Sequence, residues 1–158
     1  MENALVSGIA FQKDQVKFTL HGVGDVPGTA FKILGPISNA GVEVDVIVQN
    51  VSVDGKTDFT FTVASEDEDS VKKVIDDVKE EVKCKDLIVN SDIAKVSLVG
   101  FGMRSQTGVA SRAFKALSEN DVNIQIICTS EIKITMVIDE SLVDKAVRVL
   151  HEEFELDK

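Results

Sequence analysis

The sequence has no tryptophan and no tyrosine, and it contains only two cysteines, two histidines and two prolines. Two cysteines are too few for a disulfide framework or a four-ligand zinc site, so they are expected to be free thiols of the cytosol. No apolar run approaches the roughly 18 residues that a membrane-spanning helix needs. The amino-terminal segment also lacks a basic stretch followed by a long apolar one, so no secretory signal is expected. These absences predict a cytoplasmic protein that contacts no membrane.

Positive charge is scarce as well, because 17 Lys and Arg residues stand against 27 Asp and Glu residues, for a formal net charge of −10. An acidic chain repels phosphate backbones, so nucleic acid is not an expected partner. The acidic run at 65–70 lacks the glycine and the ligand spacing of a calcium loop, and it is expected to be a solvated helix start. We therefore expect no metal and no cofactor. A chain of 158 residues, 44% of them hydrophobic, fits one domain or two small domains.

An internal repeat organises the chain. Residues 16–50 and residues 94–131 have the same order of alternating strand, glycine-containing turn, helix and second strand. Chance rarely aligns turn glycines and apolar positions together, so we predict a duplicated unit. Four aligned pairs carry the match: Gly22 with Gly100, Gly28 with Gly108, Ala30 with Ala110, and Val44 with Ile124.

Hydrophobic periodicity predicts the elements of each repeat. Apolar and polar residues alternate over 16–21, 58–63 and 132–138, which is typical of half-buried antiparallel strands, with Ile132 expected on the buried face. Apolar residues recur at a spacing near 3.6 over 71–82 and 142–150, which predicts helices that cover one side of the sheet.

A split βαβ unit needs one more strand than each repeat supplies by itself. Residues 86–91 and the amino-terminal residues 4–11 are the two candidates, and we expect the first to complete one sheet and the second to complete the other. The predicted fold is α+β and ferredoxin-like, βαββαβ, in two domains. One comprises residues 15–91, and it is inserted into a discontinuous domain of residues 1–14 plus 92–158.

Pro36 lies in the middle of the first predicted helix, after Gly35. An interior proline costs a straight helix about 3 kcal/mol. The helix is therefore expected to kink or to end early at this point.

The turn between the first strand and the first helix has the chemistry of an amino-acid site. Pro27 suits the first helical turn, and Gly28 lets a ligand approach the backbone. The unpaired N–H groups of a helix start favour a carboxylate, and Asp25 is suited to an ammonium group. The second copy repeats this backbone around Gly108 and adds hydroxyl groups. The residues leave open a second interpretation, in which both are simply tight turns.

Other functional classes lack their residues. The helix-free face of the sheet is predicted to carry threonine and lysine rather than the aromatic rings that stack RNA bases. The Gly-x-Gly turns lack the full dinucleotide fingerprint. An acylphosphatase-like enzyme needs an anion-cradling loop with an arginine, and the first repeat contains no arginine. Neither His21 nor His151 has a Ser or Cys at a catalytic spacing.

Six segments resemble the ACT-domain family of amino-acid sensors, and most closely the regulatory region, or β subunit, of aspartate kinase. The segments are DVPGTA, VDVIVQNVS, KTDFTFTV, AKVSLVGFGM, TGVASRAF and ICTSEIKITMVI. The resemblance covers almost the whole chain and implies two tandem ACT domains in a regulatory homodimer. It also implies that threonine or lysine binds at interfaces and inhibits a catalytic aspartate kinase domain or subunit. The chain itself is then expected to have no catalytic activity, and the alternative is a stand-alone ACT-type sensor of another enzyme.

The resemblance also assigns site residues, in two sets. The first effector site comprises a turn, a strand residue and two residues from across the interface, namely Asp25, Pro27, Gly28, Ala30, Gln49, Asn123 and Ile124. The second comprises Met103, Ser105, Thr107, Gly108 and Ala110, with Asp45 opposite and Thr129, Ser130 and Glu131 nearby.

Overall fold

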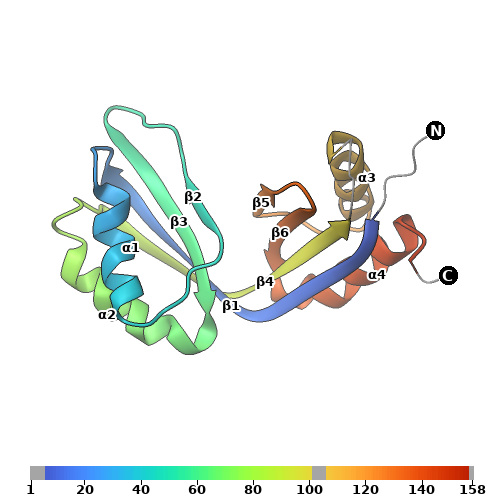
Figure 1. Ribbon diagram of the computed structural model, residues 1–158, viewed down its shortest axis with the longest axis horizontal. Helices are drawn as coiled ribbons and strands as arrows, with labels where there is room; N and C mark the ends of the chain where they lie inside the picture. Colours follow the sequence, from blue (N-terminus) through green and yellow to red (C-terminus); the bar gives the residue numbers. More distant parts are fainter. Residues whose placement is uncertain (1–5, 101–105, 157–158) are drawn as a thin grey trace. The chain divides into compact units, whose positions relative to one another are not determined.

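The computed structural model describes residues 6–100 and 106–156 (Figure 1). This part of the chain forms six strands and four α-helices, which confirms the predicted α+β class. In chain order, and with two single 3-10 turns, they are β1 (Val6–Gly24), α1 (Thr29–Asn39), β2 (Ile47–Gln49), β3 (Lys56–Ala64), η1 (Ser65–Asp67), α2 (Glu68–Val78), β4 (Asp86–Gly100), α3 (Gln106–Glu119), β5 (Ile126–Thr129), β6 (Lys133–Asp139), η2 (Glu140–Leu142) and α4 (Val143–Glu153).

The chain divides into two compact units, which we call the inserted unit (Gln15–Ser91) and the discontinuous unit (Met1–Asp14 with Asp92–Lys158). Strands β1 and β4 each run without interruption through a boundary between the units, although the sequence pattern predicted two separate strands at each place. Asp14, the last residue before the inserted unit, has a left-handed φ of 58°, which is unusual within a strand. Each of these long strands therefore serves both units.

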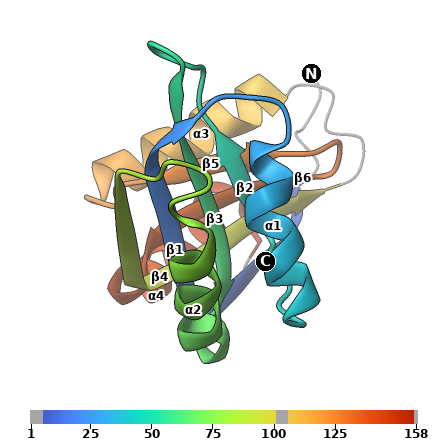
Figure 2. The same ribbon diagram turned by 90° about the vertical axis from the view of Figure 1, so that its left-hand side faces the viewer.

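In the inserted unit the strand order is β2-β3-β1-β4, and helices α1 and α2 cover one face of these strands (Figures 1 and 2). The alternating residues of β1 and β3 face this side, as predicted. Phe18 lies opposite Phe61 and the two rings stack at 5.5 Å between centroids. Ile33 of α1 and Ile75 of α2 are fully buried against them. The order of elements and strands is that of the predicted ferredoxin-like fold.

The discontinuous unit repeats this arrangement, with strand order β1-β4-β6-β5 and helices α3 and α4. Leu98, Ile134 and Met136 are fully buried in its core. Arg112 in the middle of α3 contacts the last residue of α4, because its Nε donates to a carboxylate oxygen of Glu153 at 2.9 Å. The prediction for Ile132 was wrong, because β6 begins one residue later and leaves this side chain 46% exposed.

Pro36 does not end α1, which continues to Asn39, so the expectation of an early end was wrong. The missing N–H of proline leaves the carbonyl of Lys32 without its helical partner, and Lys32 is an exposed residue that water can reach. Burial of Ile37 one residue after the proline anchors the last turn. In the described part of the chain, no helix has the length and apolarity needed to cross a membrane.

We predict that Leu20→Ala lowers the free energy of unfolding by about 2–5 kcal/mol, because it leaves a cavity under α1 and α2. Leu20 has no exposed surface. Val51→Ala is the control, since Val51 is 90% exposed and its truncation is expected to change stability by less than about 0.5 kcal/mol. Chemical denaturation of both variants measures the difference, and equal stabilities would contradict the assigned core.

Candidate functional site

The predicted ligand turn lies between β1 and α1 in the inserted unit. It is closed by the hydroxyl of Thr29, which donates to the carbonyl of Gly24 at 2.7 Å, and by the Thr29 N–H, which donates to the carbonyl of Val26 at 3.2 Å. Gly28 is the N-cap residue of α1. Pro27 therefore lies in the turn before the helix, which corrects its predicted place in the first helical turn.

Gly28 leaves the start of α1 open to a ligand. Its φ of 93° belongs to a region that side chains rarely adopt, and a Cβ built on it would meet no atom within 4 Å. At this helix start the N–H groups of Ala30 and Phe31 have no partner within the helix. The first turn of α1 contains no acidic side chain to compensate its partial positive charge. The turn is thus suited to a carboxylate group.

Asp25 adds a negative charge beside this helix start. The residue is exposed, and its N–H donates to the carbonyl of Gly55 at 2.9 Å, which ties the turn to the hairpin before β3. A carboxylate near a helix start gives the turn groups of both signs, as the zwitterion of an amino acid requires.

Gln49 lies at the end of β2, opposite Phe59 of β3. Strand β2 is the last strand in the order, so one of its edges is free for a further strand. Gln49 and Ile47 are both exposed there. Within the residues described, no side-chain hydrogen bond joins Gln49 to the turn at Gly28. A shared site would therefore have to be completed by a ligand or a partner.

The two residues expected to face this site from another chain lie together in the discontinuous unit. Asn123 and Ile124 line a hollow of about 490 Å³ between the end of α3 and β5, with Phe114 and Ile127 on its apolar side. Strand β5 is the last strand of this unit and, like β2, has a free edge. The structure thus places both sets of residues beside edge strands.

The second predicted site is only partly described, because Met103 and Ser105 lie outside the described residues. Thr107 and Gly108 are exposed in the first turn of α3, and Ala110 is half-buried against the core. The remaining residues are exposed in loops or at a strand end, namely Thr129, Ser130 and Glu131 in the discontinuous unit and Asp45 in the inserted unit.

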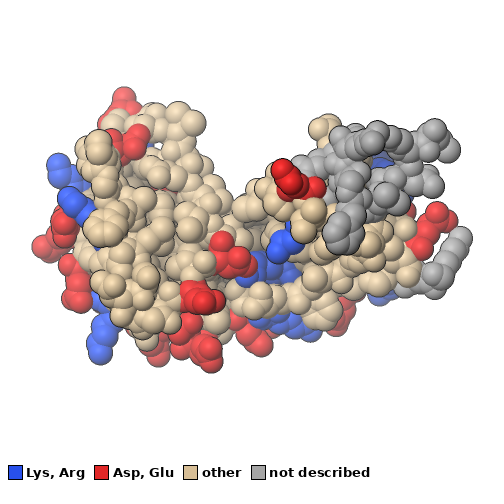
Figure 3. Space-filling view, viewed as in Figure 1, with Lys and Arg blue, Asp and Glu red and all other residues tan. Residues whose placement is uncertain are grey.

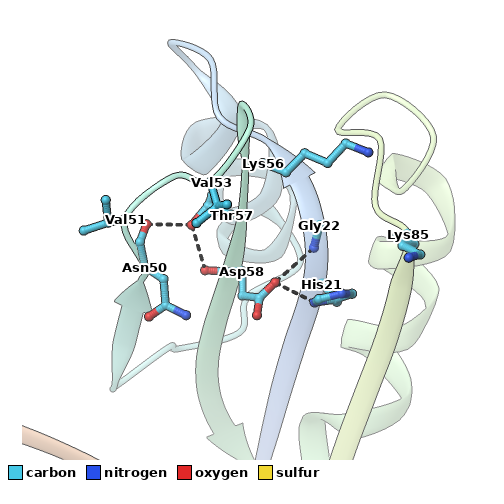
Figure 4. Close-up of a pocket in the computed structure, with 9 residues that line it drawn as sticks. All are labelled: His21, Gly22, Asn50, Val51, Val53, Lys56, Thr57, Asp58 and Lys85. Atoms are coloured by element: carbon cyan, nitrogen blue, oxygen red, sulfur yellow. Dashed lines mark hydrogen bonds and ion pairs between the residues drawn. The ribbon is translucent and has the colours of Figure 1, made fainter.

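One pocket was not predicted from the sequence, in which His21 has no Ser or Cys at a catalytic spacing. It lies in the inserted unit and has a volume of about 350 Å³. His21 Nδ1 is 2.7 Å from a carboxylate oxygen of Asp58, and Lys56 and Lys85 line the same space (Figure 4). The Asp54-Gly55 pair was an available signal for part of it, because this dipeptide favours a two-residue hairpin that brings Lys56 opposite Val53.

Ionisable groups outside this pocket include the acidic residues of α2 and the thiol of Cys84. The acidic start of α2 is a solvated face, and carboxylates gather on the surface there (Figure 3). A hydrogen bond from Lys72 at 2.6 Å lowers the pKa of Glu68. Burial raises the pKa of the Cys84 thiol, so this group is a poor nucleophile. Within residues 6–100 and 106–156, no three His, Cys, Asp or Glu side chains are grouped to hold a metal ion.

Comparison with protein families agrees with the two units. Two profiles described as ACT domain match the chain, one at residues 20–82 and the other at residues 96–154. An aspartate kinase of Pseudomonas fluorescens is 54% identical over 157 residues, which are 99% of this chain and 38% of that protein. The chain therefore spans well under half the length of this relative.

Solved structures are similar over nearly the whole chain. A crystal structure of aspartokinase alpha and beta subunits is 43% identical with a TM-score of 0.88, and the match covers 95% of this chain and 99% of that one. The ligand-free regulatory subunit of aspartate kinase from Thermus thermophilus is 32% identical, with the same TM-score and the same coverage.

We predict that Gly28→Ala lowers stability by about 1–2 kcal/mol, because a Cβ is strained at this φ although it has room. Gly8→Ala is the matched control, since a Cβ there also meets no atom within 4 Å and its φ is not positive. Thermal unfolding compares the two variants. A Gly28→Ala variant as stable as the control would show that the turn does not have this geometry.

Proposed function

Because the chain belongs to the family of aspartate kinase regulatory regions with tandem ACT domains, we propose that it binds threonine or lysine and thereby inhibits phosphorylation of aspartate. The phosphorylation itself belongs to a catalytic aspartate kinase domain or subunit. The observation that carries this proposal is the open turn at Gly28, where a helix start and Asp25 offer partners to both charged groups of an amino acid.

The bound amino acid is proposed to lie with its carboxylate on the N–H groups at the start of α1 and its ammonium group near Asp25. Metabolites that act at micromolar to millimolar concentrations need only about −4 to −8 kcal/mol of binding free energy. A charge-assisted hydrogen bond contributes about 1.5–3 kcal/mol. A few such contacts and a small apolar surface are enough.

The site is proposed to be completed by a second copy of the chain. Gln49 and Ile47 lie on the free edge of β2, and Asn123 and Ile124 line a hollow beside the free edge of β5. Exposed apolar side chains at these edges, Ile47 at 48% and Ile127 at 47%, suit an interface between the inserted unit of one copy and the discontinuous unit of another.

Inhibition follows if the effector binds one arrangement of the two copies better than another. A ligand shifts such an equilibrium only by its difference in affinity between the two states. A coupling of about 1–3 kcal/mol changes the affinity at the other site by roughly 5–150-fold. A ligand held between two copies meets this requirement, because its contacts exist only while the copies are correctly apposed. The residues Asp45, Thr107, Gly108, Ala110, Ser130 and Glu131 are proposed to form the second such site.

We predict that Asp25→Ala weakens binding of the effector about tenfold, because the ammonium group loses its carboxylate partner. The fold is expected to be unchanged, since only the backbone N–H of Asp25 makes a described contact. Calorimetric titration with threonine, with lysine and with both measures the affinity. Asp77→Ala, an exposed acid on α2, removes the same charge elsewhere and is expected to bind normally. Unchanged affinity of Asp25→Ala for every effector would overturn the assignment of this turn.

We predict that Ile127→Lys weakens both self-association and effector binding, because it places a charge at the hollow of Asn123. Ile88→Lys is the matched control, since Ile88 is also a strand isoleucine and is 49% exposed. Sedimentation velocity measures association with and without the effector, and calorimetry measures binding. If both variants associate like the unmodified chain, the proposed interface at β5 is wrong.

A separate experiment tests the regulatory role. The chain is expected to bind a catalytic aspartate kinase subunit, and the effector is expected to inhibit the kinase activity of that complex.

A further inference from the structure

The pocket that contains His21 lies within the inserted unit, at one end of its strands. Figure 4 shows its residues coming from β1, from β3, from the segment between β2 and β3, and from Lys85 just before β4. His21 follows the buried Leu20 in β1, so its side chain lies on the face away from α1 and α2. The pocket is thus separate from the turn at Gly28.

A β-bulge shapes one wall of this pocket. Leu20 pairs with Phe59 and Val23 pairs with Thr57, so His21 and Gly22 together lie opposite Asp58 alone. Gly22 has a φ of 70°, and its N–H donates to a carboxylate oxygen of Asp58 at 3.1 Å. The same oxygen lies 2.7 Å from His21 Nδ1, which leaves Nε2 as the ring nitrogen available to a ligand.

Two lysines complete the pocket, and backbone hydrogen bonds and turns fix the position of each main chain. The N–H of Lys85 donates to the carbonyl of His21 at 2.9 Å, so Lys85 lies beside the bulge. Lys56 follows a two-residue turn in which Asp54 and Gly55 both have positive φ. In Figure 4 the Lys56 side chain extends from β3 towards the side of the pocket where Lys85 lies.

Neither lysine is neutralised within the part of the chain that the structure describes. The ammonium groups of Lys56 and Lys85 have no ion pair and no hydrogen bond there. In contrast, Lys72 pairs with Glu68 at 2.6 Å and Lys79 pairs with Asp76 at 3.4 Å. The one carboxylate that lines the pocket, Asp58, already accepts from Gly22 and lies against His21. In a chain of charge −10, this pocket is locally positive.

The fold does not require this group of residues, as the discontinuous unit shows. Both units join the matching strands through paired hydroxyl groups, Thr19 with Thr60 at 3.1 Å and Ser97 with Thr135 at 2.9 Å. Two residues after Ser97, however, Val99 pairs with Lys133 in place of a histidine and a carboxylate. The His21–Asp58 pair is therefore particular to the inserted unit.

We propose that this pocket binds a small oxyanion, a carboxylate or a phosphate, between the ammonium groups of Lys56 and Lys85. His21 lies in the same pocket, with its ring held in place by Asp58. Ammonium groups around an open pocket are donors that such anions prefer, and about 350 Å³ suits a small molecule. The proposal does not depend on threonine or lysine binding at the turn of Gly28.

Nuclear magnetic resonance titration of the whole chain tests this pocket. Inorganic phosphate and malonate are the probes, and sodium chloride at equal ionic strength is the reference. We expect saturable shifts of the amide signals of Gly22, Lys56 and Lys85 with either probe. A response to phosphate alone identifies a phosphoryl ligand and a response to malonate alone identifies a carboxylate, and either result supports the proposal.

Charge removal gives the decisive comparison. The double variant Lys56→Gln with Lys85→Gln is expected to weaken anion binding about tenfold. The matched control, Lys73→Gln with Lys83→Gln, removes two exposed lysines outside the pocket and is expected to bind normally. If the double variant does not fold, each single variant is expected to weaken binding about threefold. Equal shifts with sodium chloride, or equal dissociation constants for the pocket and control variants, would overturn the proposal.

Discussion

Burial of one face of the strands under two helices is the constraint on which both units depend. Full burial of a Leu, Ile or Phe side chain contributes about 1.5–3 kcal/mol, and residues such as Phe18, Leu20 and Leu98 have no exposed surface. Because side chains alternate along a strand, the residues between the buried ones point to the opposite face of the sheet, and many of these are polar. The proposed ligand groups therefore lie where strands end, since a substitution there does not disturb the core.

Two glycines with positive φ mark these ends in the inserted unit. Gly22 forms the bulge that brings His21 and Asp58 together, and Gly28 caps α1 at the open turn. A single hairpin connects the two places, because Gly55 accepts from the N–H of Asp25 and directly precedes Lys56. The turn at Gly28 and the lysine pocket are thus both held by the hairpin at Gly55. The side chains proposed to bind a ligand differ between them.

The two units show what duplication preserves. The buried faces, the strand order and the paired hydroxyl groups are common to both. The residues at the strand ends have changed, as with His21 and Val99 at matching positions. Burial limits core positions to apolar residues of similar size, whereas an exposed strand end tolerates a change of charge. The two units of one fold are therefore free to differ in the polar groups at their strand ends.

The alternation of Val16, Phe18 and Leu20 and the repeated glycine turns predicted the elements and the βαββαβ order, because these patterns are local. The family was indicated by the resemblance of segments such as DVPGTA and TGVASRAF. The limits of local patterns appear at Pro36, which α1 tolerates, and at Ile132, which lies before β6 rather than inside it. Only the tertiary structure brought His21 to Asp58, 37 residues away, because a bulge changed the register between β1 and β3. The register between two strands depends on contacts between residues that are distant in the sequence. The spacing of residues along a single strand therefore does not predict it.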